Sequence, residues 1–153
     1  MRAMDLILWR HADAHPGEPD LERTLTGKGR RQAAQIALWL EKHLPDSARV
    51  LVSPAVRAVE TADALGRKYK TMKELAPGAQ AAGHLAAADW PDNRHPVLLV
   101  GHQPALGRLA ALLMFGEEQD LSMRKGSVWW LTNRSREDGH KIVLRAAICP
   151  EYL

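Results

Sequence analysis

The chain of 153 residues has a single cysteine, one Phe and two Tyr, and it has no long apolar run. One cysteine cannot form an intrachain disulfide, and because Cys149 lies in an apolar run near the C-terminus, we expect it to be a buried and unreactive thiol. No segment is apolar enough over sufficient length to cross a bilayer. The apolar stretch Leu6–Trp9 is too short for a signal peptide and ends at Arg10, so we expect a cytoplasmic protein.

The chain also lacks a strong excess of charge of either sign, because it has 21 Lys and Arg and 18 Asp and Glu, which gives a net charge of +3. A nucleic-acid groove requires a concentrated stripe of cations. The densest cluster, Lys28 with Arg30 and Arg31, is interrupted by Gly29 and indicates the solvated start of a helix. We therefore expect an anionic substrate or partner and no nucleic acid.

Metal-ligand spacing is missing as well, although the chain has seven His. His11 and His15 lie four apart, which suits a chelate only on a helix, and Pro16-Gly17 argues against a helix there. No cysteine lies near either of them. We predict no metal and no other cofactor.

The apolar pattern alternates between strand-like and helix-like segments, which is typical of an α/β domain. Strands are predicted at Asp5–Trp9, Val50–Val52, Tyr69–Glu74, Pro96–Val100, Ser127–Asn133 and Lys141–Ile148, the last two joined as a hairpin around Asp138-Gly139. Helices are predicted at Thr26–Leu44 with Thr26 as the N-cap, Pro54–Leu65, Ala79–Asp89 and Leu106–Leu113. With no repeat or linker, residues 1–153 are expected to form a single three-layer α/β/α domain, its sheet mostly parallel with an antiparallel C-terminal part.

Three of the predicted strand-to-helix junctions carry residues suited to binding phosphate. Arg10 and His11 follow the first strand, Ser53 and Arg57 the second, and His102 the fourth. Because ligands bind at the carboxyl ends of the strands in an open α/β sheet, we expect these side chains to meet at one edge. Helix N-termini at that edge add free N–H groups and partial positive charge. The pattern predicts a phosphate pocket that contains a nucleophile.

The dipeptide Arg10-His11 favours phosphoryl transfer in particular. Arginine binds phosphate oxygens in a bidentate manner, and imidazole is a nucleophile that is already partly uncharged near neutral pH. An anion clamp beside such a nucleophile indicates transfer through a phosphohistidine intermediate.

Four segments match, in order, the motifs of a known family. They are the R-H pair Arg10-His11, the L-T-x-x-G-x-x-Q-A segment Leu25–Ala33, the S-P-x-x-R-A-x-x-T-A segment Ser53–Ala62 and the G-H-x-P segment Gly101–Pro104. On these motifs the chain resembles the histidine phosphatase, or phosphoglycerate mutase-like, superfamily. The short length, Leu75–Gly78 and Lys125–Ser127 resemble its SixA-type phosphohistidine phosphatases.

The resemblance implies a phosphoglycerate mutase-like fold and roles for the junction residues. His11 would be the nucleophile, and Arg10, Arg57 and His102 would bind the phosphoryl group with help from Ser53 and Gln103. Ser53 would also cap the following helix. The transferred group spreads charge over its equatorial oxygens, so fixed cations directed at them supply most of the catalysis. The sequence leaves the protonation state of His102 open.

The chain departs from the family pattern at two positions. Ala12 follows Arg-His where the family usually has Gly, which is costly if that position requires φ > 0. Pro77 stands where larger members place a general-acid Glu. The remaining candidates for an acid are Glu74, Asp13 and Glu18. The alternative for each is a solvated carboxylate with no catalytic role.

Without the general-acid Glu, the site is suited to some leaving groups better than to others. An alkoxide must be protonated as it departs, whereas an imidazole protonated on its other nitrogen leaves as a neutral ring. We therefore predict a phosphatase for phosphohistidine on a signalling protein. One alternative is a small-molecule phosphomonoesterase or phosphoramidase of the same superfamily, and another is a phosphate-binding module without turnover. A mutase is disfavoured because the chain lacks the insertions that enclose a phosphosugar.

Overall fold

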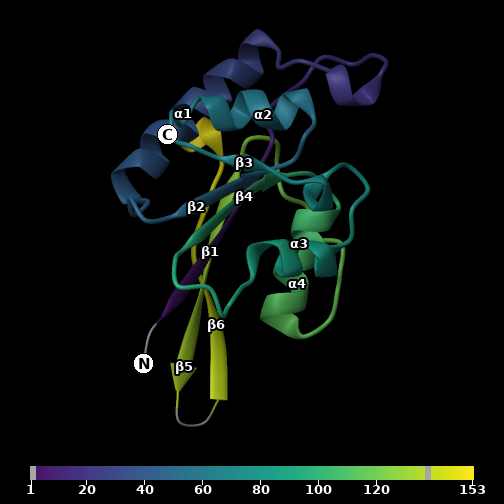
Figure 1. Cartoon of the computed structure of the whole chain (residues 1–153). Helices are drawn as coiled ribbons and strands as arrows, with labels where there is room; N and C mark the ends of the chain where they lie inside the picture. The colour runs from purple at the N-terminus through teal and green to yellow at the C-terminus, as the bar shows by residue number, and fades with distance from the viewer. Residues whose placement is uncertain (1–2, 137–138) are drawn as a thin grey trace.

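One six-stranded sheet with helices on both faces forms the protein (Figure 1), whose computed structural model describes residues 3–136 and 139–153. The strands are β1 (Met4–Arg10), β2 (Arg49–Val52), β3 (Lys70–Thr71), β4 (Val97–Gly101), β5 (Val128–Arg136) and β6 (Gly139–Ile148). Their order is β3-β2-β4-β1-β5-β6. The pairs among β1 to β4 are parallel, and β5 is antiparallel to both β1 and β6. The predicted mixed sheet is confirmed.

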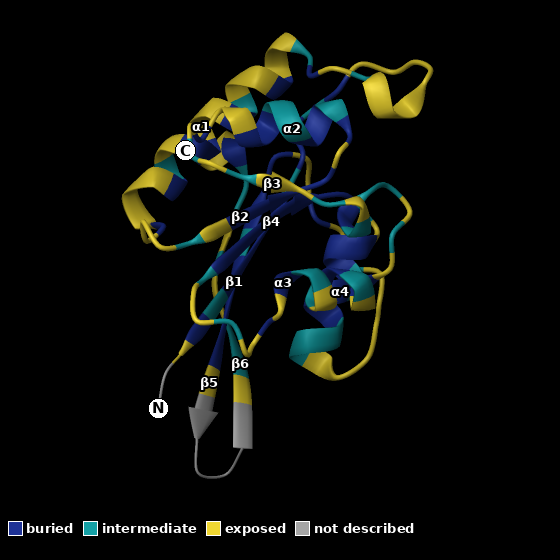
Figure 2. Cartoon of the chain, in the orientation of Figure 1, coloured by how far each residue is buried: buried dark blue, intermediate teal, exposed yellow. Residues whose placement is uncertain are grey.

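The helices form two layers because the buried strands are apolar on both faces (Figures 1 and 2). Along β1, Ile7 and Trp9 face one core and Leu6 and Leu8 face the other, as alternation requires. The first core is closed by α1 (Gly27–His43) and α2 (Val56–Asp63), and the second by α3 (Ala81–Ala88) and α4 (Ala105–Phe115). The predicted three-layer α/β/α arrangement is present.

The start of α1 is fixed by Thr26, the predicted N-cap. Its hydroxyl accepts a hydrogen bond from the Gly29 N–H at 2.9 Å and donates one to Asp13 Oδ2 at 2.8 Å. The Thr26 N–H also donates to the Asp13 carbonyl at 3.0 Å. These bonds tie the loop that follows His11 to the first turn of a long helix.

Two elements of the structure begin or end at other residues than the sequence predicted. Helix α2 begins at Val56, not at Pro54, because Ala55 is its N-cap and the hydroxyl of Ser53 accepts a hydrogen bond from the Ala55 N–H at 3.2 Å. The predicted Tyr69–Glu74 strand shortens to the two residues of β3 and is followed by a 3-10 turn, η2 (Lys73–Leu75), that inserts Leu75 into the core.

The C-terminal part of the chain bears on two further expectations. Cys149 is half-buried, so the expected full burial of this thiol is wrong. It directly precedes the short η3 turn (Pro150–Tyr152), where the chain leaves the sheet. The predicted turn around Asp138-Gly139 lies partly outside the described residues, although the antiparallel pairing of the two strands it joins is confirmed.

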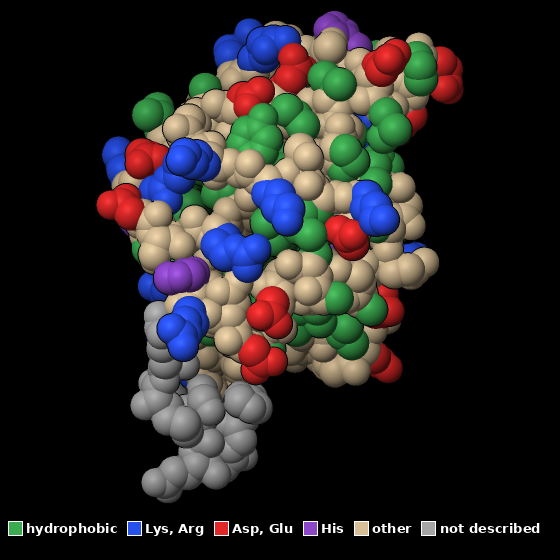
Figure 3. All heavy atoms as spheres, in the orientation of Figure 1, with side chains coloured by type: hydrophobic (Ala, Val, Ile, Leu, Met, Phe, Trp, Pro, Cys, Tyr) green, Lys and Arg blue, Asp and Glu red, His purple; other side chains and the backbone are tan. Residues whose placement is uncertain are grey.

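No helix in the described parts of the chain is both long and apolar enough to cross a membrane. On the face in Figure 3, Lys and Arg side chains alternate with Asp and Glu and form no continuous basic stripe.

The close approach of α1 to the Asp13 loop gives a first prediction. A Cβ on Gly29 would lie 2.0 Å from the Asp13 carbonyl oxygen, a backbone atom that cannot move aside cheaply. We expect Gly29→Ala to lower the free energy of unfolding by about 1–3 kcal/mol, measured by urea denaturation. Gly27→Ala is the matched control, since only the flexible end of Arg31 lies near its Cβ, at 3.6 Å. Equal losses in the two variants would contradict this.

Candidate active site

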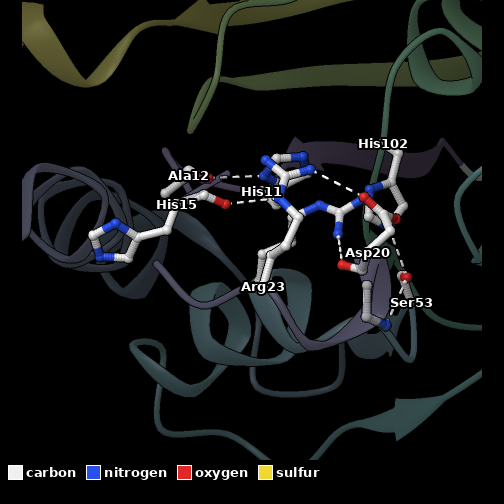
Figure 4. Close-up of polar contacts among 9 residues, drawn as sticks. His11, Ala12, His15, Asp20, Arg23, Ser53 and His102 are labelled. Carbon is white, nitrogen blue, oxygen red and sulfur yellow. Dashed lines mark hydrogen bonds and ion pairs between the residues drawn. The ribbon is translucent and has the colours of Figure 1, made fainter. Parts of the chain in front are cut away.

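The carboxyl ends of β1, β2 and β4 bring three of the predicted residues together. The His11 N–H donates to the Gly101 carbonyl at 3.0 Å, which joins the ends of β1 and β4. Ser53 follows β2, and its N–H donates to the Val100 carbonyl at 3.0 Å. The rings of His11 and His102 lie 5.1 Å apart. His11, Ser53 and His102 are all buried, so they form a preorganised group at one edge of the sheet (Figure 4).

The imidazole of His11 is held in one tautomer. Its Nδ1 lies 2.8 Å from the Ala12 carbonyl oxygen, which can only accept, so Nδ1 carries the proton. Burial lowers the pKa of His11 to about 4, assisted by the positive charges of Arg57 and Arg10 and opposed by the bond to Ala12. The ring is therefore neutral near pH 7, and Nε2 carries a free lone pair.

His102 is neutral for the same reasons. Burial lowers its pKa to about 3, with further contributions from His11 and Arg57. Its Nε2 shares a 2.7 Å hydrogen bond with the hydroxyl of Ser53, while its Nδ1 is buried without a partner among the described residues. The expected helix-capping role of Ser53 is wrong, because its oxygen serves the Ala55 turn and His102.

The guanidinium of Arg57 enters the site from the first turn of α2. Its Nη1 donates to the Asp20 carbonyl at 2.8 Å and its Nη2 to Asp20 Oδ2 at 3.1 Å, while its Nε is buried without a partner among the described residues. Arg57 is 5% exposed, so its charge is fixed in direction by packing. It is the most constrained cation near His11.

Arg10 ends β1 beside the nucleophile. Its Nη1 donates to the Met123 carbonyl at 2.7 Å, and its Nε is buried without a partner among the described residues. It also lines a cavity of about 380 Å³ with three further cations, Lys28, Arg124 and Lys125. Asp13 and Glu151 also line this cavity and pair with Lys125 and Arg124, so the basic hollow beside Arg10 has four cations against two carboxylates.

Ala12 fits its position without strain. It is fully buried, and among the described residues other than glycine only Asp89 has a positive φ, so Cβ at position 12 carries no conformational cost. Its N–H donates to Thr61 Oγ1 at 3.0 Å, and that hydroxyl donates to the Arg57 carbonyl at 2.7 Å. Thr61, to which the sequence assigned no role, therefore couples the backbone of the nucleophile to the helix that carries Arg57.

Gln103 is directed differently from the other predicted residues. Its amide nitrogen donates to the Leu121 carbonyl at 2.7 Å, and its amide oxygen accepts from the Gly107 N–H at 2.7 Å. Both groups thus hold the start of α4 against the 116–127 segment. A substrate-binding role for Gln103 stays a prediction.

The candidate acids lie outside this hydrogen-bonded group. Asp13 is bound to Thr26 and to Lys125 Nζ at 3.1 Å, and these two contacts hold its pKa below the usual value. Glu18 is exposed, and Glu74 lies half-buried in η2. Within the described parts of the chain, no group of three His, Cys, Asp or Glu side chains is placed to hold a metal ion.

A carboxylate that the sequence did not single out lies in the site. Asp20, from the 3-10 turn η1 (Asp20–Glu22), contacts Arg57 and also accepts from Arg23 Nη1 at 3.0 Å (Figure 4). The bond from Arg23, followed by that from Arg57, holds the pKa of Asp20 below its usual value. Arg23 in turn donates from Nε to the His15 carbonyl at 2.7 Å. Asp20 does not directly follow a strand, so the junction pattern that found the other residues could not point to it.

The low pKa of His11 gives a second prediction. Imidazole ¹⁵N NMR of the ligand-free protein should show His11 neutral, with Nδ1 protonated, down to about pH 5 and titrating near pH 4. Because the unfolded ring takes up its proton at about pH 6.5, acidification between about 6.5 and 4 should also lower the free energy of unfolding. The His11→Ala spectrum identifies the signal. A midpoint near 6.5 would contradict the burial argument.

Known proteins with related sequences and structures fit this geometry. The profile of the histidine phosphatase superfamily (branch 1) matches residues 6–81. The phosphohistidine phosphatase SixA of Escherichia coli K12 is 31% identical over 125 residues, which cover 74% of this chain and 76% of that protein. An uncharacterized protein of Picosynechococcus is 32% identical over 138 residues, 82% of each chain.

Solved structures extend the similarity to the whole domain. A protein histidine phosphatase SixA complexed with tungstate superimposes with a TM-score of 0.80 at 26% identity, covering 97% of this chain and 99% of the other. The putative phosphohistidine phosphatase SixA from Nakamurella matches with a TM-score of 0.78 at 26% identity, over 98% of both chains. With the ordered motifs, the shared fold and these relatives, the chain belongs to the histidine phosphatase superfamily and is a SixA-type phosphatase.

Proposed function

We propose that this phosphatase takes the phosphoryl group from phosphohistidine on a signalling protein, transfers it to His11 and releases it to water. The observation that carries the proposal is the His11–Ala12 hydrogen bond, because it directs an unprotonated Nε2 away from the backbone as the nucleophile. The charges of Arg57 and Arg10 act on His11, and the His102 ring lies 5.1 Å from the His11 ring, so these three side chains would hold the equatorial oxygens of the group in transit.

The ionisation of the site favours a nitrogen leaving group. At neutral pH both histidines are neutral with Nδ1 of His11 committed to Ala12, and Asp20 is ionised between two arginines. None of these groups is a ready proton donor for a departing alkoxide. A phosphoimidazole protonated on its free nitrogen needs no donor, since the P–N bond breaks with its electron pair to give neutral imidazole.

The names of two relatives also support the proposed activity. One is named a phosphohistidine phosphatase, and the structure of another is complexed with tungstate, a tetrahedral oxyanion like phosphate. The basic hollow beside Arg10 is open to the surface and would accommodate a protein-borne group better than an enclosed sugar pocket. A cytoplasmic location stays a prediction.

The test compares substrates under one set of conditions. The initial rates on a ³²P-phosphohistidine-bearing phosphotransfer domain should exceed those on a panel of alkyl and sugar phosphates by at least about tenfold. Alkaline quenching should trap a phosphoenzyme whose label resides in the peptide containing His11. Faster turnover of the esters would favour the small-molecule phosphomonoesterase, and protein without any turnover that still binds vanadate would favour a binding module.

A further inference from the structure

The segment before α1 reaches the site through one residue. All side chains of residues 15–22 are exposed, yet Asp20 places both its carbonyl oxygen and one carboxylate oxygen on the buried guanidinium of Arg57. The other carboxylate oxygen is bound to Arg23. Figure 4 shows Asp20 among His11, Ser53 and His102. Among the described residues, this exposed turn supplies the one carboxylate that contacts a predicted phosphoryl-binding group.

The contacts of Asp20 define where it lies relative to a phosphoryl group. Bidentate binding of phosphate by arginine uses the N–H groups of the guanidinium edge. Asp20 takes one N–H group of each Nη of Arg57, which leaves the second N–H of each Nη, and Nε, without a bond to it. A phosphoryl group that takes these donors must either share the guanidinium with the carboxylate or displace it slightly. In both cases Asp20 is adjacent to the group bound to His11, with Arg23 still holding its Oδ1.

A carboxylate and a phosphoryl group that share the Arg57 cation still repel each other where their oxygens face directly, and a proton donor between them relieves that repulsion. A water molecule meets that need, because it can donate to the carboxylate while its oxygen lone pair faces phosphorus. The ionised state of Asp20, maintained by Arg23 and Arg57, suits a proton acceptor and not a donor.

We propose, resting on the proposed function, that Asp20 is a further catalytic residue: the base that accepts the proton of the water that hydrolyses phospho-His11. The water oxygen forms a bond to phosphorus as the bond between phosphorus and Nε2 breaks. The electron pair returns to Nε2, Nδ1 keeps its proton on the Ala12 carbonyl, and the water proton passes to the Asp20 carboxylate and then to solvent. The products are inorganic phosphate and the neutral His11 of the ligand-free protein.

The test separates the two half-reactions with Asp20→Asn, which keeps the size of the side chain and removes its basicity. The full-length protein is labelled with ³²P-phosphoramidate, quenched in alkali for the formation rate, and chased with unlabelled reagent for the decay rate. We expect formation within about threefold of wild type and decay about 100-fold slower, so that labelled protein accumulates. Glu22→Gln, a change in an exposed carboxylate of the same turn, should decay like wild type.

Asp20→Glu provides a rescue, since it restores a carboxylate and should decay faster than Asp20→Asn. Decay of Asp20→Asn at the wild-type rate would overturn the inference. Equal losses in formation and decay would overturn it too, because they would mean that Asp20 only holds Arg57 in place. If no variant, wild type included, takes up label, the phosphohistidine pathway itself is wrong and the proposed function fails with it.

Discussion

His11→Ala is expected to lower phosphatase turnover by about 10⁵-fold and to abolish the trapped phosphoenzyme. No other group of the site can replace it: His102 shares its Nε2 with Ser53, and the arginines cannot be deprotonated near neutral pH. Removal of a nucleophile in a preorganised site costs on the order of 10⁶-fold, and the remaining cations retain only binding and electrostatic stabilisation. Initial rates with phosphoramidate and alkaline-quench labelling measure both effects.

The loss should be chemical and not structural. His11 lies just after the end of β1, so the alanine variant should keep its circular dichroism spectrum and still bind vanadate through Arg57 and Arg10. His95→Ala, which changes an exposed histidine, is the matched control and should retain full turnover. A phosphoenzyme that persists in His11→Ala would place the covalent intermediate elsewhere and contradict the assignment.

The sequence predicted the sheet, the helix layers and the convergence of the junction residues because each depends on short-range pattern. Apolar runs such as that of β1 mark strands buried on both faces, and Thr26 before a helical apolar pattern predicted a cap. The parallel order then forces the carboxyl ends of β1, β2 and β4 to one edge. Local sequence therefore sufficed for the residues that follow directly after strands.

Asp20 could not be found in this way. It lies 37 positions from Arg57, in a segment where Pro16, Gly17 and Pro19 interrupt any periodicity. Its contact depends on the path of that loop, which only the tertiary structure defines. For Ser53 the local pattern was misleading. Ser-Pro before a helix favours a capping prediction, yet the Ser53 hydroxyl is hydrogen-bonded to the Ala55 N–H and to His102.

Arg57→Ala is expected to lower kcat/KM by about 10³-fold. The guanidinium is nearly enclosed, so its N–H groups act in a poorly solvated environment on charge that grows in the transition state. One such cation contributes about 10³-fold or more in phosphoryl transfer, about 4 kcal/mol at 1.36 kcal/mol per tenfold change. Arg57→Lys should recover little, since a single ammonium cannot reproduce two parallel donors. Arg67→Ala, which removes a half-buried arginine bound to Glu41 and to the Leu44 carbonyl, should leave kcat/KM unchanged.

Arg57→Ala also distinguishes a role of Arg57 in catalysis from a role in holding the 15–23 segment in place. Without the guanidinium, Asp20 loses two of its hydrogen-bond partners but keeps the bond to Arg23, so the 15–23 segment should loosen only in part. His11 also loses a neighbouring positive charge, so its pKa should rise from about 4 toward its ordinary value. If kcat/KM falls less than tenfold while that pKa does rise, the charge of Arg57 reaches His11 without stabilising the transition state, and Arg10 must carry the phosphoryl group alone.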